Sequence, residues 1–142
     1  LEYVDEEGKR DMPVMIHCAI AGSLERFMSV YLEHSAGDFP LWLAPTAVSI
    51  IPINNDKHLA YATDVNNKLK QAGIKTELDD DKNGLGKKVR AAKDKKVPYW
   101  IVIGDAEVEG KTVTLESRSG EKVSITVDEL ITKLKDELEN KK

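Results

Sequence analysis

Two residues near the start of the chain have side chains of the types that bind metals and anions, His17 and Arg26. His17 lies in the apolar run Val14–Ile20, which is too short for a helix and is typical of a buried strand. Imidazole is a common metal ligand, although a single histidine in a strand can equally belong to the core. Arg26 lies in the first turn of a predicted helix, where the helix dipole disfavours a cation. It therefore either pairs with Glu25 or Glu33 or binds an anion.

A second group of candidate binding residues lies between residues 82 and 96, where seven basic residues accompany one acidic residue, Asp94. The predicted helix places most of these on one face: Lys87, Lys88, Arg90, Lys93, Lys95 and Lys96. Such a face is either simply solvated or holds the phosphates of a nucleic acid. Polar amides follow the predicted strands at Asn54, Asn55 and Asn83, where they can read unstacked bases.

The first candidate residues are positioned by a strand followed by a helix. Apolar residues spaced three and four apart predict a helix over Leu24–His34. Ser23 is suited to cap this helix, because its hydroxyl can accept a hydrogen bond from a free N–H. The helix is expected to end near Ala36-Gly37. The segment Leu1–Arg10 is expected to form a strand edge and a polar turn.

The rest of the chain alternates between strand and helix patterns. The predicted strands are Val48–Ile53, Ile74–Leu78, Val97–Gly104, Thr112–Glu116 and Lys122–Thr126. The predicted helices are His58–Ala72, Gly84–Lys95 and a final helix that begins at a capping box, Thr126 to Glu129. Helical crossovers favour parallel pairing early in this region, and a hairpin adds an antiparallel edge. We therefore expect an α/β fold, a five-stranded mixed sheet with helices on both faces.

The composition favours a globular protein that works inside the cell. Of 142 residues, 41% are hydrophobic and 32% are charged. No apolar run reaches membrane-spanning length, so we expect no membrane partner. The single cysteine, Cys18, cannot form an internal disulfide, which agrees with a cytoplasmic location. The net charge of -4 means that nucleic-acid binding needs a local basic face.

The first region resembles a known family. IHCAIAGSLERF followed by LEHSAGDFPLWLAP resembles motif 3 of the class II aminoacyl-tRNA synthetases, in the form found in the threonyl-tRNA synthetase family. The resemblance implies that Arg26 and Ser23 belong to an ATP site, with Arg26 holding the phosphates. It implies that His17 is one of three ligands of a zinc ion that selects threonine. Cys18 stands where the family usually has arginine.

The second region is similar to the C-terminal anticodon-binding domain of the same family. The similarity rests on VPYWIVIGDAE at Val97–Glu107 and on DDDKNGLGKKVR at Asp79–Arg90. It implies the tRNA-binding residues Arg90, Lys87, Lys88, Asn83, Asn54 and Lys93. Asp81 and Asn83 replace an arginine and a base-reading glutamate of the family pattern.

Together the resemblances imply a C-terminal piece of a threonine-tRNA ligase. Residues 1–46 would end the catalytic domain and residues 47–142 would form the anticodon-binding domain. The longer protein would use threonine, Mg-ATP and zinc to charge threonine tRNA, and would be a homodimer. We expect this piece alone to be inactive as a ligase, to bind no cofactor tightly and to recognise the anticodon loop.

Two other interpretations remain open at this point. The chain can be a free-standing adaptor that uses the same fold to bind RNA or a protein without ligase activity. It can also be a piece of a prolyl- or glycyl-type synthetase, although His17 together with GSLERF and FPLWLAP argues against this.

Overall fold

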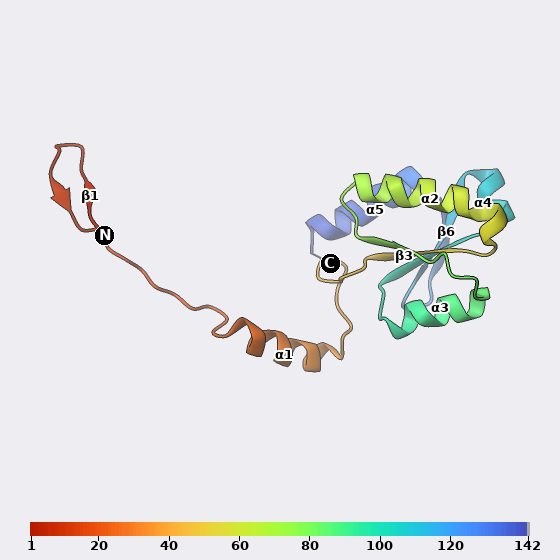
Figure 1. Ribbon diagram of the computed structural model, residues 1–142, viewed down its shortest axis with the longest axis horizontal. Coiled ribbons are helices and arrows are strands. Elements are labelled where there is room, and N and C mark those ends of the chain that lie inside the picture. Colours follow the sequence, from red (N-terminus) through yellow and green to blue (C-terminus); the bar gives the residue numbers. More distant parts are fainter. Residues whose placement is uncertain (142) are drawn as a thin grey trace. The chain divides into compact units, whose positions relative to one another are not determined.

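The computed structural model describes residues 1–141, and the chain divides into two compact units, Leu1–Ala36 and Gly37–Lys142. Figure 1 shows the elements of each unit. No helix within the described residues is both long enough and apolar enough to cross a lipid bilayer.

The first unit holds a small hairpin and one helix. Strands β1 (Tyr3–Val4) and β2 (Arg10–Asp11) pair in antiparallel fashion. In the turn between them, the Asp5 carboxylate accepts hydrogen bonds from the backbone N–H groups of residues 7 and 9. Gly8 has a φ of +80°, a conformation that glycine adopts without strain. The predicted strand edge and turn are therefore present as a local hairpin.

The predicted buried strand at Val14–Ile20 is wrong for this structure. The segment forms no strand, and its apolar side chains are exposed: Val14 by 91%, Ile16 by 88% and Ile20 by 96%. A strand is stable only when its backbone groups are paired and one of its faces is covered. Neither condition is met within the described part of the first unit.

Helix α1 (Leu24–Ser35) confirms the predicted helix and its ends. The Ser23 hydroxyl accepts a hydrogen bond from the backbone N–H of Arg26 at 3.4 Å, as a capping residue does. Ala36 ends the helix in the left-handed conformation, with a φ of 50°. No residue of this helix is buried.

The second unit is built on a five-stranded sheet in the order β4-β3-β5-β6-β7. The strands are β3 (Val48–Pro52), β4 (Thr76–Leu78), β5 (Tyr99–Ile103), β6 (Thr112–Ser117) and β7 (Lys122–Thr126). β3 pairs in parallel with β4 and β5, whereas β6 pairs antiparallel with β5 and with β7. The predicted mixed sheet is confirmed.

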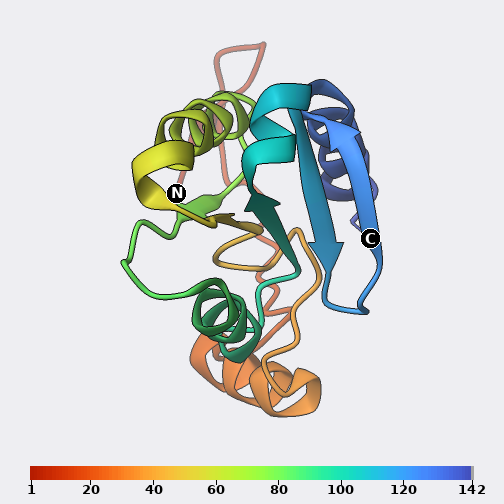
Figure 2. The same ribbon diagram turned by 90° about the vertical axis from the view of Figure 1, so that its right-hand side faces the viewer.

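Helices cover both faces of this sheet (Figure 2). They are α2 (Asn55–Gln71), α3 (Leu85–Asp94), α4 (Asp105–Gly110) and α5 (Val127–Glu139). The larger core joins α2 and α5 to one face through residues such as Ile50, Val65 and Leu130, each fully buried. A smaller core joins α3 to the other face through Ile51, Ala92 and Trp100.

One feature of the second unit differs from the sequence prediction. Helix α4 was not predicted, since only a turn was expected near its end. Its first turn is closed by the Glu107 carboxylate, which accepts a hydrogen bond from the Gly104 N–H at 2.9 Å. The compact second unit also includes residues 37–46, in which Leu41 and Ala44 are buried. The assignment of residues 1–46 to a catalytic domain remains a prediction.

Candidate functional site

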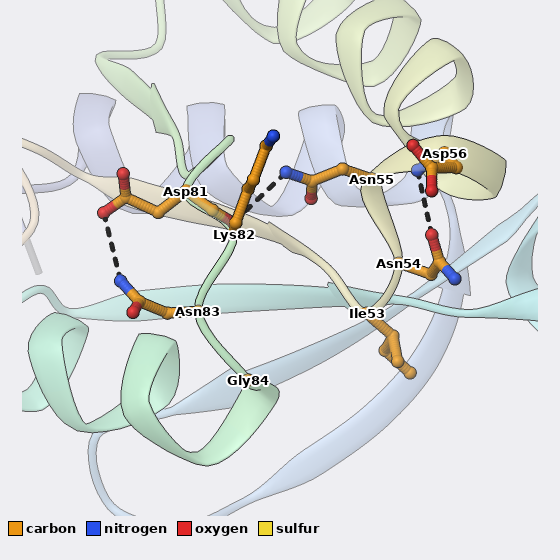
Figure 3. A pocket seen from close by; sticks show the side chains of 8 residues that line it. All are labelled: Ile53, Asn54, Asn55, Asp56, Asp81, Lys82, Asn83 and Gly84. Carbon is orange, nitrogen blue, oxygen red and sulfur yellow. Dashed lines mark hydrogen bonds between the residues drawn. The ribbon is translucent and has the colours of Figure 1, made fainter.

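A groove of about 420 Å³ lies where β3 and β4 end, at the carboxyl edge of the parallel strands. One wall is Ile53–Asp56, which leads into α2, and the other is Asp81–Gly84, which leads into α3 (Figure 3). Two helix N-termini therefore border the same groove. The positive ends of helix dipoles favour negative groups, and the crevice beyond the carboxyl ends of parallel strands is the usual place for a ligand.

The α2 wall is held by His58, a residue that the sequence patterns did not mark as part of a site. The Asn54 side-chain oxygen caps α2 by accepting a hydrogen bond from the Asp56 N–H at 2.8 Å. The Asn54 backbone N–H donates to Nδ1 of His58 at 3.1 Å. Because Nδ1 accepts, the imidazole carries its proton on Nε2. This N–H donates a hydrogen bond to the Asp105 carboxylate at 3.1 Å. This hydrogen bond, together with the charge of Lys57, lowers the pKa of Asp105.

The Asn54 amide nitrogen has no hydrogen-bond partner among the residues that the structure describes. Asn54 is exposed, so the amide can donate to a ligand in the groove. The spacing of Asn54 and His58, four residues apart at a helix start, was the signal that could have identified the histidine.

The α3 wall carries a second asparagine. The Asn83 oxygen accepts from the Lys87 ammonium at 3.0 Å, and its amide nitrogen lies 3.4 Å from the Asp81 carboxylate. Gly84 precedes α3 and provides no side-chain cap. The first N–H groups of α3 therefore remain available to an acceptor. Lys82, which is not among the predicted site residues, also lines this wall.

The prediction that Lys88 lies on an exposed basic face is wrong. Its side chain is 1% exposed, and its ammonium donates to three oxygens. These are the backbone oxygens of Pro52 at 3.4 Å and Asp79 at 3.0 Å, and the Asn55 side-chain oxygen at 3.2 Å. The Asp79 carboxylate, 3.8 Å away, balances the charge. Lys88 thus connects the end of β3 and the start of α2 to the segment that follows β4.

The other predicted basic residues of α3 remain at the surface. Lys87, Arg90 and Lys93 are exposed, and Arg90 pairs loosely with Asp94 at 3.9 Å. The Lys93 ammonium lies 5.2 Å from the centre of the Trp100 ring. Lys95 forms an ion pair with Glu77. Of the predicted tRNA-binding residues, the structure brings Asn54, Asn83 and Lys87 to the groove, whereas Arg90 and Lys93 lie further along the helix.

The candidate residues of the first unit do not form a pocket within that unit. The Arg26 guanidinium is exposed and has no ion pair in the described part of the chain. Glu25 is instead engaged by the Ser23 hydroxyl at 2.7 Å, a hydrogen bond that lowers the pKa of Glu25. Neither of the glutamates considered in the sequence analysis neutralises Arg26.

His17 is exposed in the extended segment of the first unit. Residues 1–141 contain no cluster of three or more histidine, cysteine, aspartate or glutamate side chains suited to a metal. A zinc site takes about three or four protein ligands. The described residues therefore do not fit a zinc ion by themselves, and the role of His17 stays a prediction.

A second, smaller groove of about 270 Å³ lies at the other end of the sheet and includes Tyr99, Arg118 and Glu137. The Tyr99 hydroxyl donates to the Glu137 carboxylate at 3.0 Å. Burial and this carboxylate raise the pKa of Tyr99 to about 12. Arg118 pairs with Asp38 and donates to the Lys96 backbone oxygen at 3.2 Å. Because these groups satisfy one another, this groove holds the segment after Gly37 in place.

Comparisons with known proteins agree with this architecture. The sequence pattern of one protein family, described as the anticodon binding domain, matches residues 47–137. The chain is 44% identical over 141 residues to a threonine--tRNA ligase of Natranaerobius thermophilus, covering 99% of this chain and 22% of that protein. It is also 44% identical over 140 residues to a threonine--tRNA ligase of Clostridioides difficile, covering 98% of this chain and 22% of that protein.

A solved structure is similar as well. The RNA binding domain of threonyl-tRNA synthetase from Cryptosporidium parvum Iowa II superposes with a TM-score of 0.79 at 34% sequence identity. The similarity covers 83% of this chain and 30% of that chain. The chain thus spans about 22% of the length of the curated relatives that it matches.

Proposed function

The chain belongs to the anticodon binding domain family, and from this premise we propose that its second unit binds the anticodon loop of threonine tRNA. The observation that carries the proposal is the groove between the N-termini of α2 and α3, with amide side chains on both walls. Sequence-specific RNA recognition targets unstacked bases in loops, which are read by hydrogen bonds to their edges. Asn54 supplies an amide N–H donor from one wall, and Asn83 supplies an amide group from the other wall.

The phosphates of the loop are held by the exposed basic residues of α3. Lys87 lies beside the groove, and Arg90 and Lys93 extend the positive surface along the helix. Contacts to phosphate position the RNA without reading its sequence. Replacing Arg90 with alanine is therefore expected to weaken binding to any RNA of this shape, and to reduce the slope of log K against log salt by about 0.7–0.9 per lost contact.

The test is a binding titration of the 142-residue chain with threonine tRNA and with the same tRNA carrying a changed anticodon. We expect the changed anticodon to bind about tenfold or more weakly, since each misread base costs about 1–3 kcal/mol in nucleic-acid recognition. Asn54→Ala should reduce this ratio, and Asn67→Ala, on an exposed part of the same helix, should leave it unchanged. Equal affinity for the two tRNAs would remove the proposal and favour an adaptor that binds RNA without reading it.

We propose further that the longer protein to which these residues correspond is a cytoplasmic, dimeric threonine-tRNA ligase. In it, Arg26 and Ser23 would belong to the site for Mg-ATP, and His17 would join two zinc ligands from outside this chain. The exposed, unpaired Arg26 guanidinium and the uncovered apolar segment around His17 support this proposal, since both have unmet bonding capacity in the first unit.

The metal part of this proposal can be tested on the chain as it stands. We expect titration of the chain with zinc to show no 1:1 binding of micromolar or tighter affinity. His17→Ala serves as the control, because any binding through His17 would be lost in it. Tight binding that depends on His17 would mean that the chain completes a zinc site without further ligands, and would contradict the proposed ligand set.

A further inference from the structure

A buried cation, Lys88, is hydrogen-bonded to the groove-lining residue Asn55 and is itself out of reach of RNA. Lys88 is 1% exposed, and its three N–H donors are matched by three oxygens from three places in the sequence. One of those oxygens belongs to Pro52, the last residue of β3, and another to Asp79, the residue that follows β4. Burying an ammonium is costly unless it is fully hydrogen-bonded, so this arrangement is specific rather than incidental.

The third oxygen extends the network into the opposite wall. Asn55 accepts from Lys88 through its side-chain oxygen, and its amide nitrogen donates to the backbone oxygens of Asp80 at 2.5 Å and Asp81 at 3.1 Å. Figure 3 shows this amide directed from the start of α2 toward the loop of Asp81. Asn55 therefore links the wall that leads into α2 with the wall that leads into α3.

We propose that Lys88 and Asn55 form a clamp that fixes the separation of the two groove walls and thereby sets which bases the groove accepts. The inference rests on the proposed function and deepens it. Asn54 and Asn83 lie on opposite walls, so the distance between their amides depends on the link that Asn55 makes. Lys88 is buried, and the polar atoms of Asn55 are engaged by Lys88 and by the backbone oxygens of residues 80 and 81, so both act as positioning residues.

Substitution of Asn55 by aspartate keeps the hydrogen bond from Lys88 and removes the hydrogen bonds to residues 80 and 81. The carboxylate can still accept from Lys88, and an acidic residue in the first helical turn is favoured by the dipole of α2. It has no N–H to donate, however, and would face the carbonyl oxygens of residues 80 and 81. Asn55→Asp is thus expected to leave the fold intact and to release the loop 80–84.

The experiment measures the affinity of the 142-residue chain for an RNA stem-loop with the threonine anticodon and for one with a changed anticodon. In Asn55→Asp, the ratio of the two affinities is expected to fall about tenfold, as for the loss of two hydrogen bonds. Backbone amide hydrogen exchange in residues 81–84 should accelerate, whereas protection in α5 should be retained. Asn55→Ala removes the amide donors and also the oxygen that accepts from Lys88, without adding charge, and should lower the ratio at least as much.

Two control variants separate the clamp from changes of charge. Lys57→Gln lowers the charge near the start of α2 by the same one unit, and Asn67→Asp makes the same chemical change on an exposed part of that helix. Both are expected to keep the wild-type ratio within about twofold.

The possible outcomes distinguish the clamp from the proposed function. If wild type discriminates between the anticodons and both Asn55 variants discriminate equally well, the clamp is overturned and the proposed function stands. A loss of affinity by the same factor for both RNAs also overturns the clamp, since a purely structural or electrostatic role has that effect. If wild type itself binds both RNAs equally, the proposed function fails and the clamp fails with it.

Discussion

The two units of this chain differ in how many of their side chains are buried, and a family motif is present even in the unit whose described residues form no core. In the described part of residues 1–36, no residue is buried, although this region carries the first and larger part of the longest specific motif. The second unit has two cores in which Ile50, Val65 and Trp100 are fully buried. A motif therefore identifies a family without providing the contacts that hold the motif in its working shape.

The physical reason lies in how much apolar surface each unit covers. Helix α1 has an apolar stripe that includes Leu24, Phe27 and Met28, yet these side chains are exposed by 62%, 50% and 62%. The stacked rings of Phe27 and Tyr31, 6.0 Å apart, contribute only locally. A helix of 12 residues is marginal by itself in water, because most helical stability comes from packing of the apolar face.

The largest expected contrast between the units is the effect of shortening an isoleucine. Ile101→Ala opens a cavity in the central strand of the second unit, where Ile101 is fully buried, and should destabilise it by about 3–4 kcal/mol. Ile16→Ala removes the same atoms from a side chain that is 88% exposed and should change the free energy of unfolding by less than about 0.5 kcal/mol. Urea denaturation measures both, and similar losses would show that the first unit has a core.

The next contrast compares two neighbouring lysines of α3. Lys88→Met leaves three oxygens and the Asp79 carboxylate without their cation, and should cost about 2–4 kcal/mol of unfolding free energy. Lys87→Met, at an exposed position, should cost less than about 0.5 kcal/mol. Equal stability of the two variants would contradict the burial of Lys88.

A smaller contrast compares the two helix caps. The Thr126 hydroxyl accepts from the Glu129 N–H at 3.3 Å, and Thr126→Ala should destabilise the second unit by about 1 kcal/mol. Ser23→Ala removes the equivalent cap of α1, and should leave the denaturation midpoint unchanged while reducing helical circular dichroism slightly. A shift of the midpoint in Ser23→Ala would show that α1 unfolds together with the second unit.

The smallest expected effect is a dependence of stability on acid pH. The Thr126 backbone N–H lowers the pKa of Glu129, and the His58 hydrogen bond lowers that of Asp105. Each carboxyl group whose pKa is lowered in the folded state stabilises the fold at a pH above its ordinary pKa. This contribution is lost as the pH falls through the lowered pKa of the folded state. Glu129→Gln retains an acceptor for the cap and should reduce the loss of unfolding free energy between pH 5 and pH 2. If the variant loses as much stability over this range as the wild type, the acid dependence comes from other carboxylates.

Most of the fold could be predicted because its signals are local. Apolar runs mark β3 and β5, the Thr126–Glu129 spacing marks the start of α5, and the polar ends of the strands mark the groove. Helix α4 was missed because six residues are too few to show helical periodicity. Only the position of Glu107, three residues after Gly104, indicated its start.

The parts that could not be predicted depend on contacts between distant residues. Lys88 lies three residues after Leu85 and four before Ala92, so helical spacing already puts it on the apolar side of α3, whereas Lys87 points elsewhere. The sequence does not show what accepts its charge there, because the partners, Pro52 and Asp79, lie at the end of β3 and just after β4. The strand expected at Val14–Ile20 is absent because no distant segment in the described part of the first unit covers its apolar side chains. An apolar run forms a strand only where a partner strand pairs with it and a neighbouring element covers it.

The most direct test of the account is to locate the RNA on the chain. Backbone amide NMR shifts of the 142-residue chain are measured as a stem-loop with the threonine anticodon is added. The account predicts that the changes cluster at Ile53–Asp56, at Asp81–Gly84 and along the exposed side of α3, with none in residues 1–36. Changes centred on α1, or on the groove around Tyr99 and Arg118, would contradict it.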